Sequence, residues 1–273
     1  MIYHATIPPC RHYIHQILTN IIYCTKYDRF VVGTPVPRTI CSYTILSNVK
    51  RQGDLISPTY PGVYPKDLSC MYKFIGKPSQ RIRLEFRDFD LFFGGAHCPF
   101  DDVKIYDGME TTAPLIGTYC GQQRNLVVYS SEHVMLVTFT TLERITEAQN
   151  RGFSAVWEFS ESFVKLDFIT QNAGEHIRGT ECDQRILSKG QSNGNVYSPN
   201  YPFLYLPKIV CRYFIYGLQD PQHLERVRLV YEKFDVPSNA NTRNSEEDQN
   251  QSTSHKVNTS ITRGRIAVQY RQV

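Results

Sequence analysis

The sequence predicts an all-β protein, in which one complete, disulfide-bonded antiparallel sandwich is followed by an incomplete copy of the same module. Two segments, 41–70 and 182–211, each begin and end with cysteine, so the cysteines of both pairs are 29 residues apart. At the same offset each segment carries the phrase Ser-Pro-x-Tyr-Pro-x-x-Tyr, which starts at Ser57 and again at Ser198. Short alternating segments between Pro, Gly and Asn turns supply the strands. A repeat of this kind indicates a duplicated module.

Composition agrees with this fold class and excludes several functions. The 273 residues leave room for about two domains, and 41% of them are hydrophobic. The 18 Tyr and 15 Phe, against one Trp, suit the packing of β-sheets. The net charge of +4 comes from scattered Lys and Arg, whereas nucleic-acid binding needs a concentrated basic patch. No apolar run reaches the roughly 18–20 residues that span a bilayer. We therefore expect no nucleic-acid partner and no transmembrane segment in this chain.

The eight cysteines predict a disulfide framework and therefore an oxidising, extracellular setting. Zinc sites built from cysteine need close pairs such as Cys-x-x-Cys, and the sequence has no such pair. No signal peptide is visible at the start of the sequence, because a basic region is missing and the apolar stretch is broken by Pro8 and Pro9. We therefore expect a fragment of a longer protein or a mispredicted first exon.

Segment 1–40 has no regular pattern and is expected to be poorly ordered. Cys10 and Cys24 lie in it, together with three histidines that fit no zinc motif. A disulfide between these two cysteines and a non-native sequence are both open interpretations.

The first module is expected over 41–160. Ile82, Leu84 and Phe86 alternate with charged residues, which predicts a strand with one buried face and one charged face. Phe, Ala, Trp and Phe alternate in the same way with smaller or polar residues in the closing strand. The expected strands, in order, are 81–87, 103–105, 126–129, 134–139 and 153–159.

Segment 161–181 is expected to link the two modules and, because it is short, to hold them in a preferred orientation. The second module is expected over 182–236, with a strand near 226–231 that mirrors the strand at 81–87. Its later cysteines are missing, so the module is incomplete. Segment 237–273 begins with a long run of Ser, Asn, Thr, Gln and charged residues, which predicts a disordered tail.

The order of these motifs resembles that of a CUB domain. Two cysteines flank the Ser-Pro-x-Tyr-Pro-x-x-Tyr phrase and are followed by an Arg-x-Arg-Leu-x-Phe strand. Then come Cys-x-x-Asp-x-Val-x-Ile-Tyr-Asp-Gly, which starts at Cys98, and Tyr-Cys-Gly, which starts at Tyr119. The resemblance covers 41–160 fully and 182–236 in part. It implies a jelly-roll β-sandwich with the disulfides Cys41–Cys70, Cys98–Cys120 and Cys182–Cys211.

Longer stretches are similar to the arthropod suppressor-of-lurcher proteins. These stretches are Phe86 to Gly95, Gly117 to Asn125, Phe159 to Phe168 and Cys211 to Asp220. Proteins of that family resemble neuropilin-and-tolloid-like proteins, which carry CUB domains and a single membrane span and act as auxiliary subunits of ionotropic glutamate receptors. The resemblance implies a synaptic location on the extracellular face of the plasma membrane, or secretion. It also implies a receptor ectodomain, that of an ionotropic glutamate receptor, as partner.

Many CUB domains bind calcium, and the resemblance implies where the ligands would lie. Tyr64 and Asp101 match the pattern, but the other two positions fall on Phe92 and near Leu142. Calcium prefers six to eight oxygen ligands. We therefore interpret Tyr64 and Asp101 as the remnant of a degenerate site and expect neither bound calcium nor another cofactor. Asp101 and Asp102 are expected instead to anchor a loop through backbone N–H groups.

The sequence contains no recognised catalytic motif, so we expect no enzymatic activity. Phe92 and Phe93 precede paired glycines and cannot both point inward. Core burial and an exposed anchor for a partner are both open interpretations of this pair. Arg81, Arg83 and Arg87 form a basic strip, which is either a solvated face or a site for an acidic partner.

The leading hypothesis is an extracellular protein–protein interaction module that is part of an auxiliary subunit of ionotropic glutamate receptors. One alternative is the non-catalytic CUB region of a secreted protease of the tolloid or complement type. Another is a truncated product without function. Asn250 and Asn258 begin sequons at which a secreted chain could be glycosylated.

Overall fold

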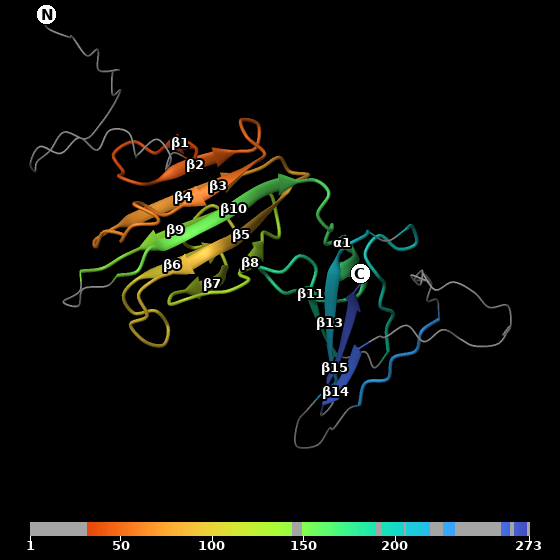
Figure 1. Cartoon of the computed structure of the whole chain (residues 1–273). Helices are drawn as coiled ribbons and strands as arrows, with labels where there is room; N and C mark the ends of the chain where they lie inside the picture. The colour runs from red at the N-terminus through yellow and green to blue at the C-terminus, as the bar shows by residue number, and fades with distance from the viewer. Residues whose placement is uncertain are drawn as a thin grey trace, which may run out of the picture.

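The chain is almost entirely β-structure, arranged as a complete sandwich and a second, smaller sheet (Figure 1). In its described part, no helix is long and apolar enough to cross a membrane, and the helix α1, Asp167–Gln171, has only five residues. Cys10 and Cys24, whose pairing was left open, lie outside the described residues. So does Asn250, a possible glycosylation site. The computed structural model describes 32–143, 149–188, 193–204, 206–218 and 226–232, and the backbone of 258–262 and 265–271.

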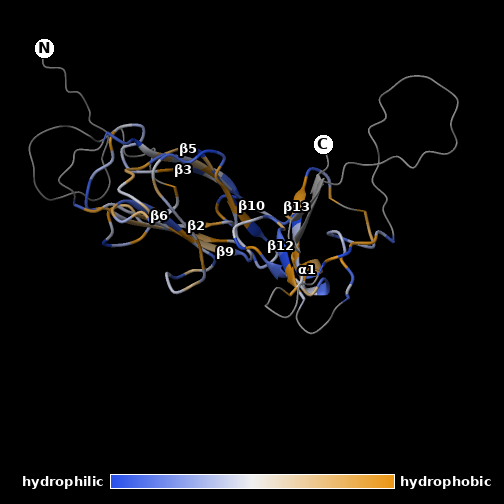
Figure 2. Ribbon diagram, turned by 90° about the horizontal axis from the view of Figure 1, so that it is seen from below, coloured by the Kyte–Doolittle hydropathy of each residue, from blue (hydrophilic) through white to orange (hydrophobic). Residues whose placement is uncertain are grey.

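The first module consists of two facing sheets, which confirms the predicted sandwich. In the view of Figure 2, β3 and β5 lie in one layer and β2, β6 and β9 in the other. The first sheet has the order β1 (Thr34–Pro35), β2 (Tyr43–Leu46), β4 (Ser69–Ile75), β9 (Val134–Thr140), β6 (Asp102–Tyr106) and β7 (Leu115–Tyr119). The second has the order β3 (Gln52–Ile56), β10 (Gly152–Ser160), β5 (Arg81–Asp90) and β8 (Val127–Tyr129). Neighbouring strands are antiparallel except for β2 and β4, which run parallel.

The first module begins earlier than the predicted boundary at residue 41. Strand β1 pairs with β2, so that Thr34 lies opposite Thr44 and Pro35 opposite Tyr43. Part of the segment expected to be poorly ordered therefore belongs to the edge of the first sheet.

Aromatic side chains fill the space between the two sheets. On β10 the buried residues alternate with half-buried ones, as the sequence predicts for a strand with one face in the core. The Trp157 ring packs edge-on against Phe74 at 5.9 Å and against Phe159 at 5.5 Å between ring centroids. Phe153 packs in the same manner against Phe139 at 5.3 Å. Such edge-to-face pairs add roughly 0.5–1.5 kcal/mol each beyond the burial of their area.

The three predicted disulfides are present. Each has a Cα–Cα distance of 4.9–5.7 Å, which lies within the range that a disulfide bridges without strain. Closing a loop of this size stabilises a domain by about 3–4 kcal/mol in the chain-entropy model. The pairs are Cys41–Cys70, Cys98–Cys120 and Cys182–Cys211.

The second module repeats the start of the first but forms one sheet in the described part of the chain. Strand β12 runs parallel to β13, just as β2 runs parallel to β4, and a disulfide joins the segments that carry these strands in each module. The sheet order is β11 (Glu175–His176), β12 (Gln184–Leu187), β13 (Val210–Tyr216), β15 (Arg265–Arg271) and β14 (Asn258–Thr262).

Two expectations for the second module differ from the structure. Strand β15 pairs along the whole of β13, and β14 pairs with β15, so the predicted disordered tail contributes two strands. The prediction of disorder rested on the polar run before residue 260. It overlooked the alternating apolar residues of 265–271, which are typical of a strand. Conversely, the predicted strand at 226–231 does not form; Val230 is exposed there, and alternation alone does not provide a neighbouring strand.

Segment 161–181 is more than the predicted linker, because it contributes to the core of the second module. Val164, Phe168 and Ile169 are buried in one cluster with Cys211 and Tyr213. The segment also carries α1 and β11, the latter paired with β12. The segment between the modules is therefore part of the second module, through its buried side chains and through its strand.

Arg81 lies at this connection and not on an exposed basic strip, which corrects the expectation. Its side chain is 7% exposed, and its guanidinium donates to four backbone carbonyls. Alternation along β5 places Arg81 on the outer face of the first sandwich, where later residues cover it. The acceptors are the carbonyl oxygens of Ser130 at 2.8 Å, Val164 at 2.6 Å, Glu181 at 2.7 Å and Thr180 at 3.3 Å.

We predict that Arg81→Ala destabilises the full chain by about 2–4 kcal/mol, because buried carbonyl groups then lose a charged donor. The free energy of unfolding from chemical denaturation measures the effect. The matched control is Arg87→Ala, which removes an exposed arginine from the same strand and should change stability by less than about 0.5 kcal/mol. Equal effects of the two substitutions would contradict the structural role of Arg81.

Candidate functional site

Three loops, between β3 and β4, β5 and β6, and β9 and β10, meet at the end of the first sandwich that lies away from the second module (Figure 1). The pairing of Ser69 with Thr140 and of Asp102 with Thr140 brings the start of β4, the end of β9 and the start of β6 to one edge. We call this end the loop edge and define it by Tyr64, Phe92, Asp101 and Leu142. The side-chain and backbone groups of these residues form one hydrogen-bonded cluster.

The carboxylate of Asp101 is the centre of the loop edge. It is fully buried, and its Oδ2 accepts a hydrogen bond of 2.8 Å from the Tyr64 hydroxyl. Its Oδ1 accepts a hydrogen bond of 3.2 Å from the backbone N–H of Leu142. The Phe92 backbone N–H donates in turn to the Tyr64 oxygen at 2.9 Å. Asp101 therefore ties together loops that are far apart in the sequence.

The residues of the loop edge do not fit a calcium ion. The resemblance to CUB domains implies that Tyr64 and Asp101 lie in one site, and the structure brings them into contact. Phe92 and Leu142, at the other two positions, contribute backbone N–H groups, which are donors, where calcium requires oxygen acceptors. Within the described part of the chain, no cluster of three or more His, Cys, Asp or Glu could hold a metal ion.

Asp102 has a different role from the one expected. Its Oδ2 accepts a hydrogen bond of 2.8 Å from the ammonium group of Lys104, the next residue but one on β6. The expectation that Asp102 also anchors a loop through backbone N–H groups is not matched by these contacts. Of the two aspartates, Asp101 is the one that accepts a hydrogen bond from a loop backbone N–H.

Large apolar side chains surround the hydrogen-bonded cluster and are exposed. We call Val63, Phe93, Phe100 and Leu142 the apolar rim; each is a member of the cluster or the chain neighbour of one. Phe93 is the most exposed of them, at 66%. Exposed aromatic groups at a rigid edge are typical of protein-binding surfaces.

The two phenylalanines before the paired glycines have different environments. Phe92 is half-buried and packs edge-on against Phe100, with ring centroids 5.8 Å apart. Phe93 lies against Gly121, where an added Cβ would come within 3.3 Å of its ring. Sequence analysis identified the pair but could not assign one member to the surface.

The loop that carries Phe93 is held in place on both sides. The Leu91 backbone N–H donates to the Gly121 carbonyl at 3.0 Å, and Cys98 is joined by a disulfide to Cys120. These restraints fix Phe93 before any partner arrives. A preformed anchor loses less conformational entropy on binding than a mobile one.

Val63 and Phe100 were missed in the sequence analysis. Val63 precedes Tyr64, and Phe100 precedes Asp101, so both neighbour the residues that were considered as calcium ligands. Both are apolar and stand next to residues expected in surface loops, and this pattern could have indicated that they are exposed. The sequence alone could not show that the loops converge.

The expected basic strip does not form. Arg81 is buried, while Arg83 donates to the Tyr129 hydroxyl at 3.1 Å and pairs with Glu85 at 2.7 Å. Arg87 is exposed. A site for an acidic partner would need the three guanidinium groups together on one free face, and this arrangement is not present.

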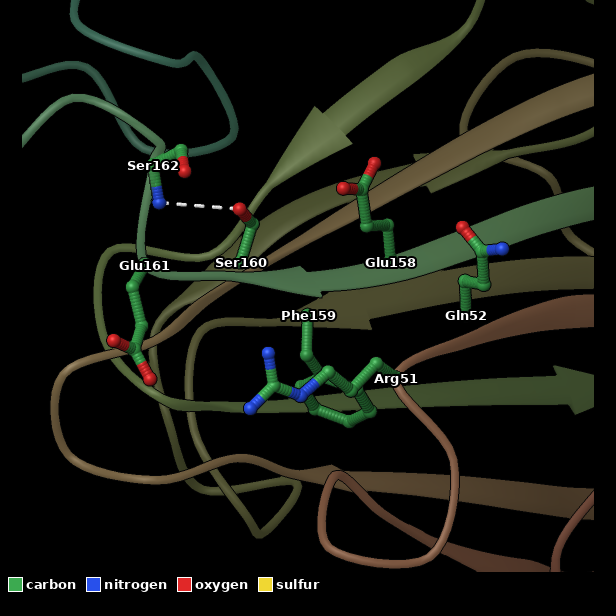
Figure 3. Close-up of a pocket in the computed structure, with 7 residues that line it drawn as sticks. All are labelled: Arg51, Gln52, Glu158, Phe159, Ser160, Glu161 and Ser162. Carbon is green, nitrogen blue, oxygen red and sulfur yellow. Dashed lines mark hydrogen bonds between the residues drawn. The ribbon is translucent and has the colours of Figure 1, made fainter.

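An open hollow of about 500 Å³ lies at the opposite end of the sandwich, beside the end of β10 (Figure 3). The Ser160 hydroxyl accepts a hydrogen bond of 3.1 Å from the Ser162 backbone N–H. The lining residues include no histidine or cysteine to act as a base or nucleophile beside these serines. They are Arg51, Gln52, Glu158, Phe159, Ser160, Glu161 and Ser162.

Many known proteins are similar to part of this chain, among them the following three. Neuropilin-1 of Gallus gallus is 36% identical over 148 residues, which cover 52% of this chain and 15% of that protein. The zinc metalloproteinase nas-39 of Caenorhabditis elegans is 35% identical over 103 residues, covering 38% and 11%. The dorsal-ventral patterning protein tolloid of Drosophila melanogaster is 26% identical over 217 residues, covering 71% and 20%. The chain therefore spans at most a fifth of the length of these relatives.

The family model of the CUB domain matches residues 41–157. This match extends from the first cysteine of the Cys41–Cys70 disulfide to Trp157 on the last strand of the sandwich. It includes every residue of the loop edge and of the apolar rim. The disulfides fit an extracellular location. Residues 41–157 of this chain therefore form a CUB domain.

Proposed function

We propose that the chain is an extracellular, non-enzymatic binding module and that its apolar rim contacts the ectodomain of an ionotropic glutamate receptor. The observation that carries the first part is Phe93, a largely exposed aromatic side chain on a loop fixed by a disulfide. The resemblance to suppressor-of-lurcher proteins supports the identity of the partner. The chain would then belong to an auxiliary receptor subunit at the synapse.

The apolar rim has the properties of an interface centre. Aromatic anchors that enter a pocket of the partner carry most of the binding energy in many complexes. Beneath the rim, Tyr64 and Asp101 are buried and hydrogen-bonded to each other, so Phe93 and Phe100 project from a surface that does not need to rearrange. A module that binds one receptor conformation better than another shifts the population of conformations toward that state.

We further propose that the loop edge works without calcium. The hydrogen bonds of Asp101 to Tyr64 and Leu142 link the loops that a metal ion would otherwise link. Both carboxylate oxygens of Asp101 already accept hydrogen bonds within the protein. Binding of a partner at the apolar rim would consequently be insensitive to chelators.

A second candidate function is the non-catalytic part of a secreted protease. The similarity to zinc metalloproteinase nas-39, 35% over 103 residues, favours this alternative. The complete coding region distinguishes the two. A membrane span and further CUB modules on the same polypeptide would support the receptor subunit, whereas a protease domain would support the alternative.

We predict that Phe93→Ala weakens binding of the full chain to the receptor ectodomain about 10- to 30-fold, because the anchor of the rim is lost. Surface plasmon resonance measures the dissociation constant. Met109→Ala removes an exposed apolar side chain after β6, outside the rim, and serves as the control with wild-type affinity. Unchanged binding by Phe93→Ala would reject the rim as the contact, and no binding by the wild type would reject the receptor as the partner.

We predict that the thermal midpoint of the chain differs by less than about 1 °C between excess calcium and excess EDTA. A site of about 10 μM affinity would add about 2.7 kcal/mol at 1 mM calcium, which a melting curve resolves readily. The double substitution Phe92→Glu with Leu142→Asp returns carboxylates to the loop edge and should make the midpoint calcium-dependent. A calcium-dependent midpoint in the wild type would contradict the proposal.

A further inference from the structure

The contact between the first module and segment 163–181 is built from groups that the proposed function does not use. Strand β8 and the segment after β11 lie side by side (Figure 1), where the Tyr129 backbone N–H donates to the Gly179 carbonyl at 3.0 Å. The Tyr129 ring packs edge-on against Phe163, with centroids 5.3 Å apart. We call this inter-module contact the junction.

Arg81 gives the junction a buried positive charge. Its guanidinium donates to the carbonyls of Ser130 on one side and of Val164, Thr180 and Glu181 on the other. These acceptors are neutral backbone groups, and the Glu181 carboxylate, whose pKa is raised by burial, adds a Coulombic attraction to the guanidinium. Burial lowers the pKa of Arg81 to about 10, so it still carries its charge at every physiological pH.

His176 lies in the same contact and uses both ring nitrogens. Nε2 is 3.1 Å from the Thr180 carbonyl oxygen, which can only accept, so Nε2 carries a hydrogen. Nδ1 is 2.9 Å from the Ser131 hydroxyl, which donates to it when the ring is neutral. The ring connects the first module, through Ser131, to the second, and burial favours its neutral form by lowering the pKa of His176.

The carboxylates that face His176 are engaged with other donors. Asp107, after β6, accepts a hydrogen bond of 2.8 Å from the Ser131 backbone N–H, and Arg178 Nε lies 3.8 Å from its other oxygen. Asp183, before β12, accepts from the backbone N–H and the guanidinium of Arg212 at 2.8 and 3.0 Å. A proton on His176 would add a positive charge near Arg81, with both nearby carboxylates already occupied.

We propose that the junction is a proton-sensitive latch, which fixes the second module to the first at neutral pH and opens when His176 is protonated. Protonation turns Nδ1 into a donor, so the Ser131 hydroxyl must rotate and can no longer donate its hydrogen to the ring. The added charge is repelled by Arg81. A hollow of about 410 Å³, lined in part by Arg81, Ser131 and Phe163, gives water access to the contact.

The pH range of the latch follows from the sign of the shift. Burial, and then the charge of Arg81, lower the pKa of His176 below its ordinary value of 6.5. The opposing influences of the Thr180 carbonyl, Asp107 and Asp183 are smaller. In the opened state His176 regains its ordinary pKa, so protons favour that state. The latch is fully closed above about pH 6.5 and weakens as the pH falls through the lower pKa of the closed state.

Hydrogen–deuterium exchange of the full chain tests the latch at about pH 7.5 and about pH 5.5. After correction for intrinsic exchange, the wild type should lose up to about 10-fold of the protection at 176–181 and at Tyr129, while the β9 and β10 core keeps its protection. His176→Gln can still donate to Thr180 and accept from Ser131 but does not titrate, so its protection should be the same at both values. His97→Gln, which removes an exposed histidine of the 92–98 loop, is the matched control and should behave as the wild type.

Unchanged protection in the wild type, or an equal loss in His176→Gln, would overturn the proposal. If His176→Gln is already open at about pH 7.5, the imidazole of the wild type decides the matter through its NMR titration. The His176 ring must then titrate below about 6.5, and the Tyr129 amide must shift with the same midpoint. A midpoint at or above the ordinary value would contradict the latch.

Discussion

A buried charged side chain lies at each end of the first sandwich and must be matched by hydrogen bonds inside the protein. The positions of the loops at both ends depend on this constraint. Asp101 is fully buried at the loop edge and receives donors from Tyr64 and Leu142. Arg81 is 7% exposed at the junction and donates to carbonyls of both modules. A buried charge without such partners would cost several kcal/mol. Loops that carry the partners are consequently fixed in position at both ends.

Local patterns in the sequence predicted five strands of the first module, which correspond to β5, β6, β8, β9 and β10, and distant contacts explain part of what they missed. Alternation at Ile82, Leu84 and Phe86 corresponds to buried positions of β5, and the repeated cysteine spacing corresponds to disulfides. Arg81 continues the same alternation on the outer face, but residues about 50 to 100 positions later cover it. Composition also failed for β15, because a short alternating segment follows a long polar run.

The loop edge was predictable in its parts but not in its assembly. Tyr64 and Asp101 were identified through the resemblance, and their contact follows from the strand ends that meet at one edge. The division of Phe92 and Phe93 between interior and surface depends on Phe100 and Gly121, which the chain brings in from other loops. Side-chain exposure in loops is a property of the assembled edge, and a linear pattern carries no information about it.

The pairing of Val210 with Arg271 has a consequence for the order in which the protein forms during synthesis. The strands of the first sandwich all lie within 34–160. The last of them, β10, therefore leaves the ribosome before the second module is made. Strand β13 must wait for about 60 further residues, which takes about 3–12 s at the usual rates of translation. During that interval the edge of β13 that will pair with β15 has unpaired backbone N–H and C=O groups. The nascent chain is therefore most dependent on chaperones in its second half, although the same motif begins both halves.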